Sequence, residues 1–366
     1  MADARAGEPT ASAEWFDVAI VGAGIAGLAS AGALARAGRR VVVLEKSRGV
    51  GGRMATRRLG GGTCDHGAQF FTVRSAEFGG IVATAEAAGA AATWCEGFGR
   101  SGSIGQQVTA AADGHPRWRG MRGMTDVPKF LAAGLPADRC TIRTGVRAGS
   151  IGIGAGRVRI AIDGGAAEPI AEMLEAAAAI VTSPVPQSLD LFAAGGLLGG
   201  EVSVGVQRQL EAVGYDPCFA LMLVLDRPSL VPPPGAVQYE SGPMSWIADN
   251  MQKGISALPT LTVHASGDFS RRHFDDPAED VAARLVEFVR PWIDGDPATA
   301  IVERSLHRWK FALPTTIIPA PLLVAVDVPP IVCCGDAFGG PRVEGAAASG
   351  LAAGRWVDRR LSTGEG

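Results

Sequence analysis

The chain has 366 residues, with 34 Lys and Arg against 37 Asp and Glu, so its formal net charge at pH 7 is only −3. This balance gives no sign that a nucleic acid or an anionic membrane is the main partner, and no apolar run approaches the roughly 18 residues that span a bilayer. The length suits two domains, or one large domain with an inserted lobe, and 47% hydrophobic residues are enough for a sizeable core.

The amino-terminal segment and the cysteines indicate the environment of the protein. Residues 1–14 are Ala-rich and polar, without the hydrophobic centre of a secretory signal, and we expect a disordered tail. The six cysteines show no C-x-x-C spacing, so we expect buried thiols and no metal site. A reducing, cytoplasmic location fits this pattern best.

The segment from Phe16 to Lys46 has the order of elements that binds a dinucleotide. An apolar strand at 18–21 leads into a glycine-rich loop at 22–27 and an Ala-rich helix, and a second apolar strand at 41–44 ends at Glu45. A G-x-G-x-x-G loop alone is weak evidence. The complete order at this spacing strongly indicates a nucleotide-binding βαβ unit.

The glycines and the acid of this unit each have a physical role. Gly22 permits the tight turn, Gly24 lets a pyrophosphate approach the backbone, and Gly27 lets the helix lie close to the sheet. The helix N-terminus offers unpaired N–H groups to the phosphates. Glu45 can accept hydrogen bonds from a ribose diol and would repel a 2′-phosphate, which disfavours NADP here and leaves FAD or NAD.

Two further segments can complete a nucleotide site. The loop after Glu45 contains Gly51 and Gly52 followed by Arg53, which can reach a pyrophosphate together with backbone amides. The segment 64–71 is predicted to be a strand entering the site, and Gly67 within it permits close approach of a ligand.

The middle of the chain is predicted to continue the same domain and then to leave it. Residues 121–135 indicate a helix that Thr125 or Asp126 caps. Four signals are expected after it: a strand at 140–147, a turn at 152–156, a strand at 158–162 and a helix–strand signal at 171–181. The prolines within 182–186 then indicate a crossing between domains.

Residues 187–313 differ in character from the segments before them. Apolar strands are predicted at 219–225 and 261–264, and a helix at 278–289 carries one apolar face. We therefore expect a substrate lobe with a mixed sheet and helices.

The carboxyl-terminal segment returns to nucleotide-binding chemistry. A buried strand at 331–334 precedes Gly335 and Asp336, and an Ala-rich helix follows from about Glu344 to Arg360. A nucleotide domain that the end of the chain completes is more typical of flavoproteins than of NAD dehydrogenases.

Motifs spread along the chain resemble those of FAD-dependent oxidoreductases of the broad amine oxidase type, and most closely those of bacterial renalases. These motifs are residues 21–28, 46–54, 65–72, 184–187, 264–270, 307–310 and 334–336. The resemblance implies an α/β fold with a Rossmann-like FAD-binding domain of the amine oxidase/hydroxylase type and a second, mixed-sheet (α+β) substrate domain. We expect residues 15–80, 120–186 and 314–366 in the first domain, and 81–119 and 187–313 in the second.

The resemblance also implies which residues hold FAD. They are Gly22, Gly24, Ile25, Ala26, Gly27, Glu45, Lys46, Gly52, Arg53, Met54, His66, Gly67, Ala68, Gln69, Phe70, Val146, Gly335, Asp336, Arg342, Val343, Glu344 and Ala346. Among them the backbone of Val146 would meet the adenine. The helix N-terminus at 343–346 would stabilise the negative charge of the reduced flavin ring.

The resemblance further implies a reaction. Renalase-like enzymes oxidise the 2- and 6-dihydro isomers of NAD(P)H: a hydride passes to flavin N5, NAD(P)+ is returned, and O2 takes the electrons to give hydrogen peroxide. By motif matching, His264, Trp309 and Tyr239 would frame the nicotinamide ring. The expected partners are therefore a reduced nicotinamide dinucleotide and O2.

Two alternatives remain open. A flavin amine oxidase would place aromatic rings beside the flavin and often a lysine at flavin N5, for which Lys310 is the one plausible residue in this chain. An FAD-binding protein without turnover is the other alternative, and steady-state peroxide production would separate it from an enzyme.

Overall fold

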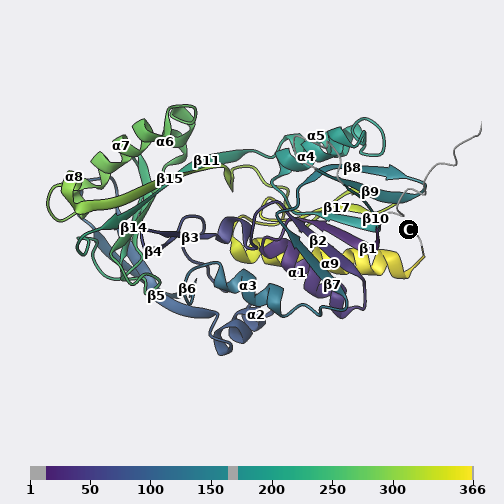
Figure 1. Cartoon of the computed structure of the whole chain (residues 1–366), viewed down its shortest axis with the longest axis horizontal. Helices are drawn as coiled ribbons and strands as arrows, with labels where there is room; N and C mark the ends of the chain where they lie inside the picture. Colours follow the sequence, from purple (N-terminus) through teal and green to yellow (C-terminus); the bar gives the residue numbers. More distant parts are fainter. Residues whose placement is uncertain (1–13, 164–171, 365–366) are drawn as a thin grey trace, which may run out of the picture.

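Two large sheets lie one after the other along the long axis of the molecule (Figure 1), and a two-stranded hairpin forms a third, small sheet. The computed structural model describes residues 14–163 and 172–364. Of the expected tail, residues 1–13 lie outside the described residues, and Glu14 already belongs to a strand. The predicted α/β fold with a nucleotide-binding part and a mixed-sheet part is confirmed.

The larger sheet carries the predicted βαβ unit near its centre. In spatial order its strands are β16 (Leu323–Val326), β17 (Ile331–Cys333), β10 (Glu172–Val181), β1 (Glu14–Val21), β2 (Val41–Glu45) and β7 (Cys140–Thr144), while β9 (Arg157–Ile162) pairs with β10 and β8 (Ala148–Gly154) pairs with β9. The strands from β17 to β7 run parallel. Every residue of β2 is buried, as expected in a parallel sheet that is covered on both faces.

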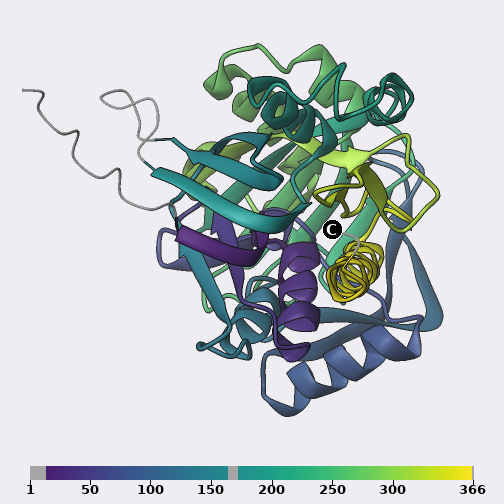
Figure 2. The same cartoon turned by 90° about the vertical axis from the view of Figure 1, so that its right-hand side faces the viewer.

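Helices cover both faces of this sheet (Figure 2). On one face α1 (Ile25–Arg36) and α9 (Val343–Ser362) lie side by side, because Gly350 lets their backbones approach: a Cβ there would collide with the carbonyl oxygen of Ala26. The other face is covered by α4 (Val185–Ala194) and α5 (Val204–Glu211), and α3 (Asp126–Ala133) packs beside α1. No helix in the described part of the chain is long and apolar enough to cross a membrane.

The smaller sheet is mixed. Its strands, in spatial order, are β15 (Ile301–Pro314), β11 (Tyr215–Leu225), β14 (Thr260–Ala265), β13 (Met244–Asp249), β12 (Ala236–Tyr239), β5 (Ala91–Ser101) and β6 (Thr109–Gly120). One face is covered by α6 (Gly267–Arg272), α7 (Ala278–Val289), the 3-10 turn η2 (Arg290–Trp292) and α8 (Pro297–Ala300). The other face meets the hairpin of β3 (Thr56–Leu59) and β4 (Gly62–Asp65), which projects from the nucleotide-binding part.

Packing moves two of the expected domain boundaries. The side chains of α4 and α5 lie in the core of the larger sheet, so residues 187–211 pack with the nucleotide-binding part and not with the substrate lobe. The helix α2 (Ala76–Ala87) also packs there through Val82 and Ala85, although residues from 81 onward were expected in the second domain. The helices α4 and α5 bury their apolar faces on the larger sheet, whereas α2 packs between α9 and β5.

Several local expectations also need correction. The strand expected at 140–147 ends at Thr144, and an additional strand, β8, follows it, so the turn expected at 152–156 is confined to the two residues between β8 and β9. Within 171–181 the structure has the strand β10 and no helix, and position 171 lies outside the described residues. The strand expected at 64–71 ends at Asp65, because the backbone beyond it bonds to side chains of the smaller sheet.

Candidate functional site

The loop between β1 and α1 has the shape that a dinucleotide requires. Gly22 has a φ of 106°, which L side chains rarely adopt, and a Cβ at Gly27 would collide with the carbonyl oxygen of Gly22. The tight turn and the close packing predicted at these two glycines are therefore confirmed. The surroundings of Gly24 are open within 4 Å of a Cβ position, and Ile25 and Ala26 begin α1 directly behind it. A phosphate can approach the helix N-terminus here.

The carboxylate of Glu45 holds the loops around the expected ribose position. It is buried and accepts hydrogen bonds from the backbone N–H groups of Ala23, at 2.9 Å, and Ser47, at 2.8 Å. The N–H of Val146 donates to the carbonyl oxygen of Glu45 at 2.9 Å. Lys46 donates to a glutamine of α4 at 3.2 Å. The residues predicted at the adenosine end therefore lie in one place.

Arg53 and Asp336 form a two-pronged ion pair. Both guanidinium-to-carboxylate distances are 2.6 Å, and the side chains are about a quarter and a seventh exposed. Gly52, just before Arg53, has a φ of 53° and lies against Gly24. Gly335, before Asp336, has a φ of 134°. The loop after β2 and the loop after β17 thus meet in front of the glycine-rich turn, although 283 residues separate the pair.

The N-terminus of α9 faces the region of the glycine-rich turn, and the side chain of Glu344 in its first turn contacts another loop. Arg342 precedes the helix with a φ of 131°, and Val343 and Ala346 lie in its first turn. The Glu344 carboxylate accepts hydrogen bonds from the backbone N–H groups of residues 74 and 75 and from the Ser75 hydroxyl. The side chain of Glu344 therefore anchors the turn before α2, and the predicted contact of residues 343–346 with the flavin remains a prediction for the backbone.

Three segments bring a histidine–tryptophan cluster together: the loop after β4, the strand β14 and the strand β15. The carbonyl oxygen of His66, after β4, accepts a hydrogen bond from the Trp309 indole at 2.8 Å, and the two rings stack with centroids 5.4 Å apart. His264 on β14 lies 3.3 Å from the same carbonyl oxygen and 3.4 Å from the amide of Gln69. His307 packs edge-on against both stacked rings. The predicted residues His264 and Trp309 thus meet the predicted segment 66–70.

Burial keeps these imidazoles neutral. It lowers the pKa of His66 to about 3, and the positive charge of Arg57 acts in the same direction. Burial also lowers the pKa of His264 to about 4 and lowers the pKa of His307. At pH 7 the cluster therefore offers neutral, planar rings and no cationic histidine.

Tyr239 does not join the cluster, and its predicted role is corrected. Its side chain lies in the core between the smaller sheet and α7, on the face opposite to His264. Its hydroxyl accepts a hydrogen bond from the Trp292 indole at 2.7 Å. Strand alternation explains the error, because Val237 and Tyr239 share one face of β12 while Ala236 lies on the other, beside Trp246.

The remaining predicted residues of the segment 66–70 are held closely. A Cβ at Gly67 would collide with the carbonyl oxygen of Arg53, and the N–H of Ala68 donates to that oxygen at 2.8 Å. Met54 is buried beneath it. Phe70 packs with other aromatic rings of the smaller sheet. This segment therefore lies directly against the loop of Arg53.

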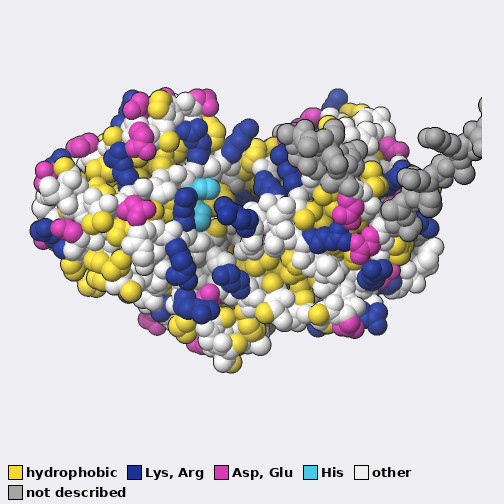
Figure 3. Space-filling view, in the orientation of Figure 1, with side chains coloured by type: hydrophobic (Ala, Val, Ile, Leu, Met, Phe, Trp, Pro, Cys, Tyr) yellow, Lys and Arg dark blue, Asp and Glu magenta, His cyan; other side chains and the backbone are white. Residues whose placement is uncertain are grey.

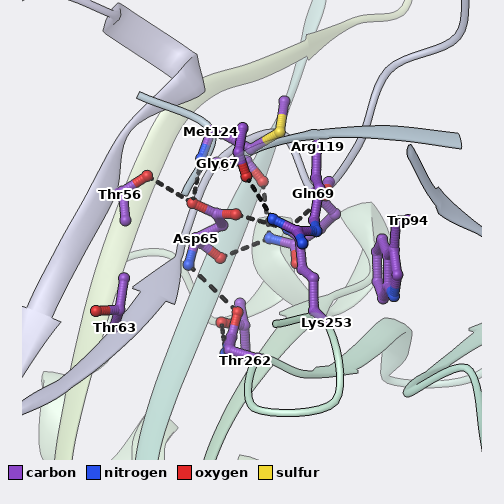
Figure 4. A network of polar contacts seen from close by, with 12 residues as sticks. Thr56, Thr63, Asp65, Gly67, Gln69, Trp94, Arg119, Met124, Lys253 and Thr262 are labelled. Atoms are coloured by element: carbon purple, nitrogen blue, oxygen red, sulfur yellow. Dashed lines mark hydrogen bonds and ion pairs between the residues drawn. The ribbon is translucent and has the colours of Figure 1, made fainter. Parts of the chain in front are cut away.

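The site contains a buried cation that the sequence did not predict. Lys253, in the turn after β13, is fully buried and donates to Asp65 at 2.6 Å and to the carbonyl oxygen of Gln69 at 2.5 Å (Figure 4). Nothing in the sequence around a lysine in a polar turn indicates burial. The lysine predicted for the amine oxidase alternative, Lys310, is exposed and lies over the ring of Phe311.

The features above fit a flavin dinucleotide: an open glycine backbone at a helix N-terminus, a buried carboxylate, and a second helix N-terminus at Val343. The chain belongs to the family of flavin-containing amine oxidoreductases, whose model matches residues 75–356. A model for an NAD(P)-binding Rossmann-like domain matches residues 20–84. The protein is thus a flavin-dependent oxidoreductase, and its cofactor is FAD.

Solved structures of similar fold agree with this family. A double mutant of putrescine oxidase is 16% identical, with a TM-score of 0.68 over 94% of this chain and 99% of that one. Cyclohexylamine oxidase from Brevibacterium oxydans IH-35A is 13% identical, with a TM-score of 0.68 over 95% and 99%. An oxidoreductase from Methanosarcina mazei is 13% identical, with a TM-score of 0.65 over 92% and 99%. At these identities the likeness concerns the fold alone.

Proposed function

We propose that the protein is an FAD-dependent oxidase that acts on the 2- and 6-dihydro isomers of NAD(P)H. Bound FAD would supply the redox chemistry: the hydride, with both electrons of the broken C–H bond, would be taken up at its ring, and the two electrons would pass to O2. The transferred hydrogen and one further proton from solvent would complete hydrogen peroxide. The donor leaves as aromatic NAD(P)+. Because hydride loss alone restores the aromatic ring, no side chain has to remove a proton from the substrate.

The charge of the site carries this proposal. The two carboxylates that meet the site segments, Asp65 and Asp336, are already paired with Lys253 and Arg53. The charge of Arg57 acts on two of the histidines, and Lys and Arg side chains surround the histidines visible on this face (Figure 3). A phosphate-bearing dinucleotide is attracted to such a surface, whereas an ammonium ion would find no free carboxylate among these groups.

The neutral rings support the same substrate. Trp309 and His66 stack in parallel, and the hydrogen bond from the indole to the His66 carbonyl prevents Trp309 from turning. A planar nicotinamide can lie against such a wall through its ring face. His264 is neutral beside it and can accept or donate a hydrogen bond according to its tautomer. The six cysteines are free thiols, which supports the proposed cytoplasmic location.

Anaerobic reduction of the FAD-loaded protein tests the proposal. Stoichiometric amounts of base-equilibrated NAD+/NADH, which contains the 2- and 6-dihydro isomers, are expected to bleach the flavin absorbance within seconds. Purified 4-dihydro NADH and a panel of primary amines, including putrescine and cyclohexylamine, are expected to leave it oxidised. Bleaching by an amine alone would replace the proposal with amine oxidation, and bleaching by none of them would exclude both substrate classes.

A further inference from the structure

The environment of Lys253 assigns its ammonium group a specific task. The side chain is fully buried, and its three N–H bonds face Asp65, the carbonyl oxygen of Gln69 and the ring of Trp94, whose centroid is 5.0 Å away (Figure 4). Burial lowers the pKa of Lys253, while the Asp65 carboxylate acts in the opposite direction. Loss of either partner of this buried ion pair would leave an uncompensated charge, so the contacts favour this one position of the ammonium group.

The partner carboxylate is held as firmly. The other oxygen of Asp65 accepts hydrogen bonds from the Thr56 hydroxyl at 2.5 Å and from the Met124 N–H at 2.8 Å. Asp65 and these two donors belong to the nucleotide-binding part, whereas Lys253 comes from the smaller sheet. The ion pair therefore ties the segment after β4 to both parts of the molecule.

The consequence lies in the peptide bond between Gln69 and Phe70. Lys253 holds its carbonyl oxygen, and in a trans peptide the N–H group points in the opposite direction. The neighbouring N–H groups of Ala68 and Phe71 donate to the carbonyl oxygens of Arg53 and Trp118. Across residues 14–163 and 172–364, no protein acceptor lies within hydrogen-bonding range of the Phe70 N–H. Its orientation is thus set by the lysine, and within the described residues this N–H is left available to donate to a ligand.

We propose that Lys253 is a positioning residue, which orients the Gln69–Phe70 peptide so that the Phe70 N–H donates a hydrogen bond to the flavin ring. The inference rests on the proposed FAD-dependent function and on the expected position of the segment 66–70 beside the flavin. A donor aimed at the ring stabilises the negative charge that the ring gains on reduction. Loss of this orientation therefore makes the flavin harder to reduce.

The test separates orientation from charge with three variants of the FAD-loaded protein. Lys253→Met combined with Asp65→Asn removes the lysine while the net charge stays unchanged, and the asparagine Oδ1 can still accept from Thr56 and Met124. Arg119→Gln removes one positive charge near the pair and leaves the lysine contact intact, since Arg119 acts on both Lys253 and Asp65 electrostatically. Lys129→Met, at an exposed lysine of α3, is the matched control.

The readouts are the flavin midpoint potential, measured by equilibration with a redox dye, and the visible circular dichroism of the bound flavin. The double variant is expected to lose at least tenfold in the reduction equilibrium, which is about 30 mV for a two-electron couple, and to change the dichroism. Arg119→Gln is expected to shift the potential less, and Lys129→Met not at all. A double variant with the wild-type potential, or with a shift no larger than that of Arg119→Gln, would overturn the inference.

A second measurement decides the question if the double variant is unstable. If the double variant does not fold, a crystal structure of the FAD-loaded wild-type protein decides instead: the Phe70 nitrogen within about 3.2 Å of a flavin acceptor supports the inference, and an N–H turned away from the ring refutes it. Neither readout uses a substrate. Bleaching by an amine would thus overturn the proposed function and leave this inference standing.

Discussion

The two parts of the molecule build their share of the site in different ways. The nucleotide-binding part uses backbone: glycines at 22, 27 and 67 let main-chain atoms approach one another, and the N-terminus of α1 lies where the phosphates are expected. The smaller sheet uses side chains, which reach across to bind main-chain carbonyl oxygens, as Trp309 and Lys253 do. A site of the first kind leaves a local pattern of glycines in the sequence, and a site of the second kind does not.

Alanine substitutions at two glycines of the nucleotide-binding part are expected to have the largest effects. Gly27→Ala is expected to prevent stable folding, because its Cβ would meet the Gly22 carbonyl oxygen and the helix would have to move away from the sheet. Gly24→Ala is expected to fold, because nothing surrounds that position, yet to bind FAD at least tenfold more weakly, since the methyl group occupies the approach to the helix N-terminus. Thermal unfolding and FAD titration of both variants check this.

Gly80→Ala is the matched control for these two substitutions. It lies in α2 with open surroundings, and it is expected to keep both properties. A Gly27→Ala variant as stable as the control would refute the steric argument.

The buried histidines are expected to make the stability of the protein depend on pH. Their pKa values in the folded protein are about 3 for His66 and about 4 for His264, below the value of 6.5 for an unperturbed histidine. Below pH 6.5 the unfolded chain binds protons that the folded protein does not, so stability is complete above that pH and falls as the pH drops. Between pH 7 and pH 5 the two groups together remove about 3–4 kcal/mol from the free energy of unfolding.

Urea unfolding of the FAD-loaded protein at the two pH values measures this loss. A His264→Asn variant is expected to lose about half of the pH dependence, since one of the two buried imidazoles is gone. An unchanged slope in that variant would show that other groups cause the acid sensitivity.

Tyr239 offers the smallest and most selective test. Tyr239→Phe removes the hydroxyl that accepts the Trp292 hydrogen bond and is expected to lower stability by about 1 kcal/mol, without changing the rate of flavin reduction. Trp309→Phe is expected to slow flavin reduction at least tenfold, because the indole hydrogen bond to His66 is lost. Stopped-flow reduction of both variants compares them. Slower flavin reduction in Tyr239→Phe would show that the Tyr239 hydroxyl contributes to the reaction after all.

The sequence predicted the fold well wherever one local pattern determined the structure. The βαβ unit, α7 and α9 lie where glycine spacing and apolar periodicity indicated. The face of β12 was not predictable, because it depends on which side of the smaller sheet α7 covers. The burial of Lys253 was not predictable either, since it arises only when a turn of one sheet meets a segment of the other.

Segments from the first and last sixty or so described residues contact each other, which affects when the nucleotide-binding part can form during synthesis. Ser30 of α1 donates to the carbonyl oxygen of Gly350 in α9 at 2.7 Å, and Arg53 is paired with Asp336. A growing polypeptide has made the glycine-rich loop long before these partners leave the ribosome. Until then α1 lacks the helix that covers its flank, and the loop of Arg53 lacks its counter-ion. We therefore expect stable loading of the cofactor only after Asp336 and α9 have left the ribosome.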